Sequence, residues 1–285
     1  TPRSGNVQVI SREASGALPK VSAQHPLARP AALFSAFTQQ GLKYVKDPVN
    51  PHGAEALDYV QFPEQTLAAR GGDCDDLAVL YASLSEAMGH PAVLVTTPGH
   101  IFAAISTGLP AQSRTTVTFD EDALLAHGGT LWVPVETTLV DKTFPEAWKG
   151  GATELARWKA EPEKIRVIDL RTAWRTYPTV DLASAAPTVR EVSAQALASE
   201  VSTSVGAADH ARSEFLKTRL AAIEQRIAET GERPELLNKK GQVLFHQGAK
   251  TQARELFERV AEDAQWGKLA RNNLGNLHMV EGRPE

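Results

Sequence analysis

The stretch GGDCDDLAVLYASLSEAMGHP, residues 71–91, predicts a helix with both of its ends marked. Asp73 is a good N-cap residue, and acidic residues in the first turn after it suit the positive end of the helix dipole. Apolar residues then recur at helical spacing, at Leu77, Leu80, Leu84 and Met88. Gly89 suits the position just after a helix, and Pro91 stops it. We therefore expect a helix that begins next to Cys74.

Apolar runs rich in β-forming residues follow this helix. Residues 92–97 (AVLVTT) and 101–106 (IFAAIS) are separated by the turn signal Pro98-Gly99, and residues 130–138 (TLWVPVETT) form a third run. One helix that leads into several closely spaced strands predicts an α+β fold with a mostly antiparallel sheet.

Composition divides the 285 residues into four parts. Residues 1–29 are polar and contain prolines, which predicts a loose lead-in. Residues 30–180 hold the helix and strands of the α+β domain. Residues 181–212 are rich in Ala, Ser, Val and Thr and lack aromatic residues, which predicts a linker with some helix. Residues 213–285 show a purely helical pattern.

The helical region repeats itself. Gly241 and Gly275 are 34 residues apart, as are Gly248 and Gly282. The positions Gly241, Leu244, Ala253 and Phe257 resemble the small and large positions of a tetratricopeptide repeat. The resemblance implies a truncated helical array that binds a protein partner. Two unrelated amphipathic helices are the alternative.

Overall properties exclude several classes of function. A formal net charge of −4 gives no electrostatic reason to expect a nucleic-acid partner, and no apolar run approaches the roughly 18 residues of a membrane-spanning helix. The single cysteine cannot form an internal disulfide or a cysteine zinc site. The start at Thr1 instead of a methionine fits either a removed leader or an excerpt of a longer chain, and a removed leader would imply an exported, periplasmic or cell-envelope protein.

Cys74 is a candidate nucleophile because of its place at a helix start. The helix N-terminus favours a thiolate, whereas the neighbouring aspartates disfavour it, so a histidine has to supply activation. His100 lies at the start of a strand, directly after the Pro98-Gly99 turn. Glu136 ends the apolar strand that comes next, where it can orient a histidine. A cysteine on a helix start with a histidine and an acid on later strands predicts a thiol active site.

The run from Val60 to Ile105, followed by LWVPVETT and FPEAWKGG, resembles a bacterial transglutaminase-like domain of the papain-related superfamily over roughly residues 30–150. The resemblance implies a triad of Cys74 as nucleophile, His100 as general base and Glu136 as orienting acid. Many members have Asp at the last position, and Asp141 is the competing acid.

The resemblance implies acyl transfer from amides of a peptide or protein substrate, most simply by a cysteine peptidase or amidase. A protein-crosslinking transglutaminase and a non-catalytic protein-binding scaffold remain as alternatives. The backbone N–H of Cys74 is one oxyanion donor, and Gln61 or Gln65 is a candidate for the other. No cofactor is expected, with calcium as an alternative. Its ligands would be Asp73, Asp75 and Asp76, which helix capping also explains.

Overall fold

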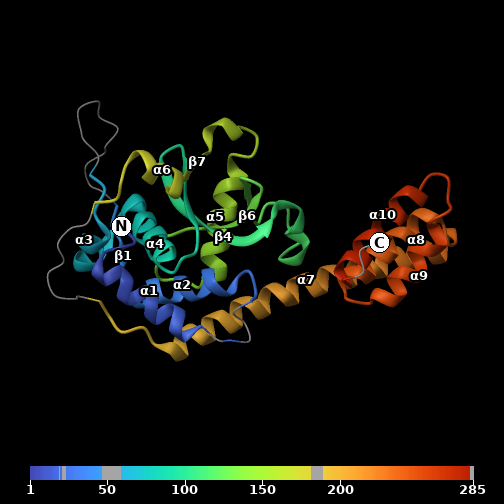
Figure 1. The fold of residues 1–285 in the computed structure, drawn as a ribbon, viewed down its shortest axis with the longest axis horizontal. Helices are drawn as coiled ribbons and strands as arrows, with labels where there is room; N and C mark the ends of the chain where they lie inside the picture. Colours follow the sequence, from blue (N-terminus) through green and yellow to red (C-terminus); the bar gives the residue numbers. More distant parts are fainter. Residues whose placement is uncertain (19, 21–23, 47–58, 181–188, 283–285) are drawn as a thin grey trace. The chain divides into compact units, whose positions relative to one another are not determined.

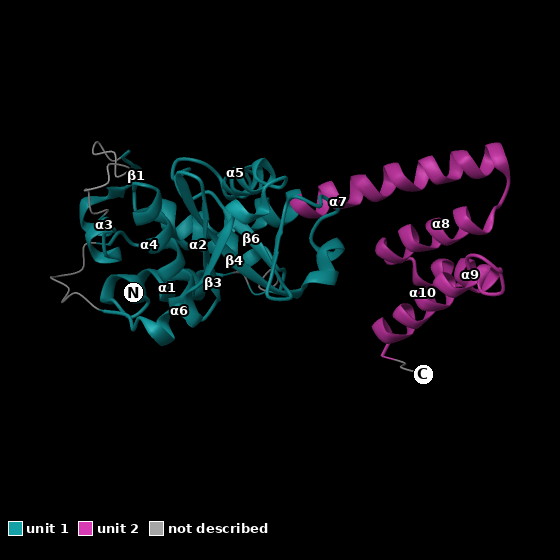
Figure 2. Cartoon of the chain, turned by 90° about the horizontal axis from the view of Figure 1, so that it is seen from above, with its two compact units in different colours: residues 1–207 teal, residues 208–285 magenta. Residues whose placement is uncertain are grey.

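The computed structural model describes residues 1–18, 20, 24–46, 59–180 and 189–282 (Figure 1). The chain forms two compact units, Thr1–Ala207 and Ala208–Glu285 (Figure 2). Helix α7 (Ala194–Thr230) begins in the first unit and ends in the second.

The first unit is built on an antiparallel sheet of five strands in the order β5-β6-β4-β3-β7. Its strands are β3 (Ala92–Thr97), β4 (His100–Pro110), β5 (Leu125–His127), β6 (Thr130–Val135) and β7 (Arg166–Asp169). The expected strands form β3, β4 and β6, and Gly99 makes the turn between the first two with φ +75°. The α+β architecture with an antiparallel sheet is therefore present.

Helices pack against this sheet. Helix α4 (Cys74–Ala87) contacts β3 and β4, and α5 (Phe144–Arg157) contacts β6 (Figure 1). The others in the first unit are α1 (Gly5–Ala17), α2 (Ala28–Gln39), α3 (Pro63–Ala69) and α6 (Leu170–Thr176), with 3-10 turns at Ala111–Thr116 and Pro162–Lys164. A separate pair of short parallel strands, β1 (Lys43–Tyr44) and β2 (Gly71–Gly72), leads into α4.

Helix α4 begins and ends as the sequence predicts. Asp73 caps it by accepting a hydrogen bond from the backbone N–H of Asp76. Two contacts anchor its length: the Tyr81 hydroxyl donates to the carbonyl of Pro30 at 3.1 Å, and the Ser11 hydroxyl donates to that of Leu84 at 2.9 Å. Because these groups are buried, the helix start that carries Cys74 is held in a fixed place.

Two segments differ from the sequence prediction. The expected lead-in forms helix α1, in which Val7 and Ile10 are fully buried; residues 19 and 21–23 lie outside the described residues. Of the expected linker 181–212, residues 189–207 belong to the first unit, helix α7 covers residues 194–212, and residues 181–188 lie outside the described part. Leu197 is fully buried, and the Glu200 carboxylate accepts from the Phe144 N–H at 2.8 Å, which caps α5. Both segments are ordered by contacts with distant residues, which their weak local patterns do not reveal.

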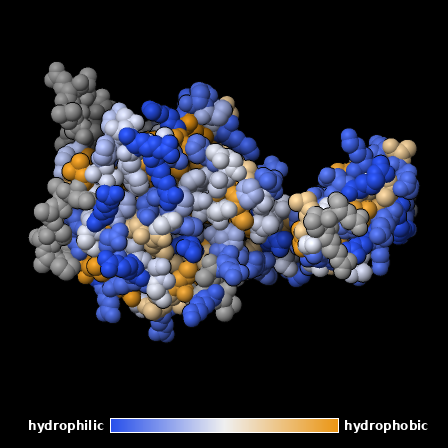
Figure 3. All heavy atoms as spheres, in the orientation of Figure 1, coloured by the Kyte–Doolittle hydropathy of each residue, from blue (hydrophilic) through white to orange (hydrophobic). Residues whose placement is uncertain are grey.

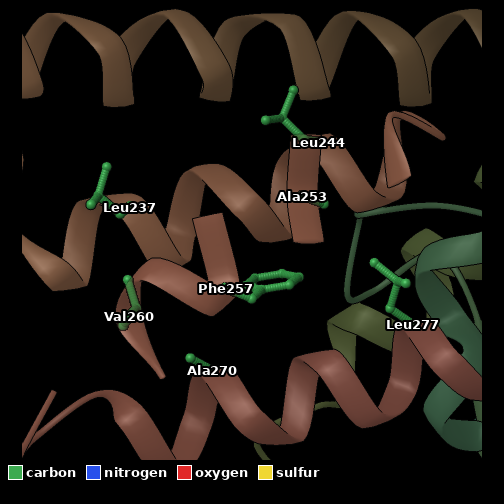
Figure 4. Packing of buried hydrophobic residues seen from close by; sticks show 7 residues of the cluster. All are labelled: Leu237, Leu244, Ala253, Phe257, Val260, Ala270 and Leu277. Atoms are coloured by element: carbon green, nitrogen blue, oxygen red, sulfur yellow. The ribbon is translucent and has the colours of Figure 1, made fainter. Parts of the chain in front are cut away.

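The second unit is helical, as expected. Helices α8 (Pro234–His246), α9 (Lys250–Val260) and α10 (Gly267–Val280) surround Phe257, which points into the space between helices in Figure 4. A Cβ on Gly241 would lie 2.6 Å from the Phe257 ring, so this glycine allows α8 and α9 to approach closely. Gly248 and Gly282, 34 residues apart, both have positive φ just after a helix. Gly275, the expected counterpart of Gly241, has open space around it.

None of the helices in the described ranges combines the length and the apolarity that a membrane crossing requires. The face of the molecule drawn in Figure 3 is mostly hydrophilic, with small and scattered hydrophobic patches.

Candidate active site

The sheet register brings two of the predicted site residues together. Ala103 of β4 pairs with Val135 of β6. One further step of this register sets Glu136 opposite Phe102, and His100 is the neighbour two residues before Phe102 on the same face of the strand. Side chains in such a diagonal relation across an antiparallel pair are within reach of each other.

The three predicted triad residues form a continuous chain of contacts. His100 Nε2 lies 2.7 Å from Glu136 Oε2, and the side chain of half-buried Cys74 lies close enough to the His100 ring to raise its pKa. Because Nε2 faces the carboxylate, the nitrogen left for the thiol is Nδ1. The interaction with Cys74 and then the hydrogen bond with Glu136 raise the pKa of His100 from 6.5 to about 10, against an opposing effect of burial. The imidazole is therefore held as a cation at neutral pH.

Glu136 is held in place by the residue two positions later. Its Oε1 accepts from the Thr138 hydroxyl at 2.6 Å and from the Thr138 N–H at 3.1 Å. Burial alone would raise the pKa of Glu136, but the hydrogen bonds from His100 and Thr138 outweigh it, so the pKa is lowered. One carboxylate oxygen thus faces the histidine, while the other is fixed by Thr138.

Two glycines of α5 let this helix sit directly against Glu136. A Cβ on Gly150 would lie 2.8 Å from Cβ of Glu136, and a Cβ on Gly151 would lie 2.7 Å from the backbone carbon of Pro134. The Glu136 N–H donates to the carbonyl of Ala147 at 2.9 Å, which ties the strand end to the helix. The Gly-Gly pair of the FPEAWKGG motif therefore fixes the position of the acid.

Tyr44 is a further residue near the thiol. It lies on β1 and pairs in register with Gly72, two residues before Cys74. Burial and then the negative charges of Cys74, Asp73 and Glu136 raise the pKa of Tyr44, so its phenol lies within electrostatic reach of all three. The sequence analysis missed Tyr44, Thr138 and Gly150, because their roles depend on strand register and on helix packing.

The two glutamines predicted as oxyanion donors have other partners in the structure. Gln61 donates its side-chain amide to Asp76 at 2.5 Å and its backbone N–H to the same carboxylate at 2.7 Å. The amide oxygen of Gln65 accepts from the Phe62 N–H and from the Tyr59 hydroxyl, each at 2.9 Å, at the start of α3. Gln61 therefore holds the first turn of α4, and Gln65 caps α3.

The acidic cluster at the start of α4 is engaged in capping. Carboxylate oxygens of Asp73, Asp75 and Asp76 lie within 4.8 Å of one another. The Asp76 N–H donates to both Asp73 and Asp75, and Asp76 itself accepts from Gln61. Burial, opposed by the hydrogen bonds from Gln61, raises the pKa of Asp76. Oxygen ligands suit calcium, but these contacts already account for the cluster.

The competing acid, Asp141, lies away from the histidine. Its side chain is 72% exposed and pairs with Lys142 at 3.1 Å. The structure thus places Glu136, and not Asp141, beside His100.

Comparison of the chain with protein-family models, with curated proteins and with solved structures finds no match in any of the three.

Proposed function

We propose that this protein transfers acyl groups from peptide or protein amides to its own Cys74 thiol, and acts as a cysteine peptidase or amidase of transglutaminase-like type. The observation that supports the proposal is the contact chain from Cys74 through His100 to Glu136. A protonated imidazole next to a thiol stabilises the thiolate, which is the nucleophilic form.

In this mechanism the Cys74 thiolate attacks the amide carbonyl carbon, and the His100 cation gives its proton to the departing amine. The C–N bond breaks and a thioester forms. The neutral imidazole then removes a proton from water, which attacks the thioester and releases the acid and the thiolate. Glu136 stabilises the imidazolium and orients the ring throughout. The Cys74 N–H, at the first position of α4, suits the oxyanion.

An activated ester tests the acylation step without knowledge of the natural substrate. Wild-type protein treated with p-nitrophenyl acetate near pH 6 should release p-nitrophenol in a burst and gain one acetyl group on Cys74 in the intact mass. His100→Ala should acylate much more slowly, and Cys74→Ser should show no burst. Equal acylation rates in wild type and His100→Ala would overturn the proposal and favour the protein-binding scaffold.

The fate of the thioester separates hydrolysis from crosslinking, because the two reactions share every step up to the acceptor. Acetyl-enzyme should break down in buffer alone if water is the natural acceptor. Breakdown that requires an added primary amine, such as putrescine, with formation of N-acetylputrescine, would favour the crosslinking transglutaminase instead.

A protein partner on the helical repeats stays a prediction. Helices of the second unit pack around Phe257 with a glycine at the close approach, and the unit keeps positive-φ glycines 34 residues apart. These features support a tetratricopeptide-type array.

A further inference from the structure

A hollow lies beside the nucleophile. It has a volume of about 490 Å³, and the two residues that precede Cys74, namely Gly72 and Asp73, are among those that line it. A Cβ on Gly72 would lie 2.4 Å from the Asp76 side chain, so the glycine makes room for Asp76, which also lines the hollow. A ligand in the hollow would therefore lie next to the group that Cys74 attacks.

Two cations line the hollow from adjacent strands. Lys43 lies on β1 and Arg70 lies just before β2, and the Lys43 N–H donates to the Arg70 carbonyl at 3.0 Å. Within the described residues, neither side chain has a hydrogen-bond or ion-pair partner. Two neighbouring cations whose side chains pair with no carboxylate can bind an anionic ligand.

The backbone conformation of Arg70 fixes where its side chain starts. Its φ is +52°, a left-handed conformation that costs free energy for a residue with a Cβ and is usually taken by glycine. Arg70 is the only described non-glycine residue with positive φ. Arg70 is the C-cap of α3, where its N–H donates to the Thr66 carbonyl, so this conformation ends the helix and leads the chain into β2 beside the hollow.

The rest of the lining defines the chemistry of the ligand. Val45 and Tyr59 are 54% and 65% exposed and offer apolar surface. The Asp76 carboxylate accepts a hydrogen bond from Gln61, whereas Asp73 adds one negative charge at the edge of the hollow nearest Cys74. Apolar surface and a nearby carboxylate favour a singly charged acid on an apolar stem over a doubly charged phosphate.

We propose that this hollow is a substrate subsite, in which Lys43 and Arg70 bind a carboxylate carried by the peptide acyl donor near the amide that Cys74 attacks. The inference rests on the proposed function. It names acidic peptides as the substrate class.

A matched pair of thiol reagents tests the subsite. Maleimidocaproic acid and maleimidocaproamide share one reactive group and one apolar stem, and differ in a single negative charge. Wild-type Cys74 should react with the acid about five-fold faster than with the amide at low ionic strength, since each exposed charge pair contributes roughly a two- to five-fold effect. The preference should fall with added salt.

The double variant Lys43→Gln/Arg70→Gln should bring the acid-to-amide ratio to about one, with each single variant in between. Arg12→Gln is the matched control, because Arg12 is exposed on α1 and does not line the hollow; it should keep the wild-type ratio. A ratio that is unchanged in the double variant, with circular dichroism showing a folded protein, would overturn the subsite.

Failure of the subsite is distinguishable from failure of the proposed function. The ratio of the two reagents reports the cations, whereas the rate with the neutral amide, compared between wild type and His100→Ala, reports thiol activation. If that rate does not depend on His100 while the ratio still responds to Lys43 and Arg70, the proposed function fails and the hollow stands as a carboxylate-binding site.

Discussion

The two units of this molecule differ in how far apart in the chain their contacting residues are. In the first unit, the candidate site joins residues from α4, β4 and β6, and each contact depends on elements that are far apart in the chain. In the second unit, consecutive helices pack on their neighbours, as α8 does on α9. The geometry of the site is therefore sensitive to small displacements of distant segments. In the second unit, a substitution affects mainly the helices next to it, because each helix contacts only its neighbours.

Two histidines of the first unit have pKa values that are shifted in opposite directions. The pKa of His100 is raised to about 10 by Cys74 and then Glu136, and that of His90 is lowered to about 4 by burial and then the charge of Arg29. At pH 7 we expect His100 to be protonated and His90 to be neutral. Ring chemical shifts from NMR across pH 3–11 measure both, and Glu136→Gln should lower the His100 pKa but leave His90 unchanged.

The two histidines also have opposite effects on stability. The raised pKa of His100 stabilises the fold fully below the unfolded value of 6.5, and this contribution is lost as pH rises toward 10. The lowered pKa of His90 makes its contribution complete above 6.5 and lost as pH falls toward 4. A His100 ring that loses its proton near pH 6.5 would contradict the ion pair on which the mechanism rests.

The next largest effect concerns the reactivity of Cys74. His100→Ala should lower the rate of iodoacetamide labelling of Cys74 at pH 6 by about 100-fold, since a positioned histidine typically contributes at least that much. Asp141→Asn is the matched control for a nearby charge and should leave the rate unchanged, because Asp141 pairs with Lys142 at the surface. An equal loss of labelling rate in both variants would show a general electrostatic effect on Cys74 and would contradict a specific Cys74–His100 pair.

Two glycine substitutions compare the packing of the units directly. Gly151→Ala should destabilise the first unit by about 1–3 kcal/mol, because its Cβ would lie 2.7 Å from the Pro134 backbone and cannot be relieved by a side-chain rotation. Gly275→Ala should stabilise the second unit by roughly 0.5–1 kcal/mol, since the position is helical and open. Calorimetric unfolding of each variant measures whether its stability rises or falls. A loss of stability in Gly275→Ala would contradict the open space around Gly275.

The sequence predicted those elements that carry strong local signals. Helix α4 has a cap, a periodic apolar face and a stop at Gly89, and β3 and β4 are joined by a marked turn. Strand β7 was missed, because its register with β3 joins residues about 70 positions apart, such as Val95 and Val167. Helix α1 was missed because its buried face mixes the apolar Val7 and Ile10 with polar or small residues such as Asn6 and Ser11.

The same distinction holds within the candidate site. Cys74, His100 and Glu136 are visible in the sequence because their residue types and the elements that carry them match a known order. Thr138 and Gly150 are not visible, because a threonine after a strand and a glycine in a helix have many ordinary explanations. Only the close approach of α5 to β6 gives them a role.

The smallest expected effect tests that role at Thr138. Thr138→Val removes the hydroxyl that donates to Glu136 Oε1 at 2.6 Å and keeps the volume and branching of the side chain. The Thr138 N–H still donates to the same oxygen, so Glu136 is loosened but not released. Loss of one hydrogen bond to a charged group corresponds to about 1.5–3 kcal/mol at most. We expect a labelling rate for Cys74 at pH 6 that falls several-fold, together with a lower His100 pKa.

The adjacent threonine supplies the control, because the two side chains differ in their contacts but not in their chemistry. The Thr137 hydroxyl is buried without a hydrogen-bond partner among the described residues. Thr137→Val therefore breaks no hydrogen bond of the hydroxyl and relieves a desolvated polar group, so stability should stay equal or rise and the His100 pKa should not move. A purely structural role for Thr138 would change the unfolding temperature without shifting the His100 titration. A shift in the titration for Thr138→Val alone would show that the hydroxyl acts on His100 through Glu136.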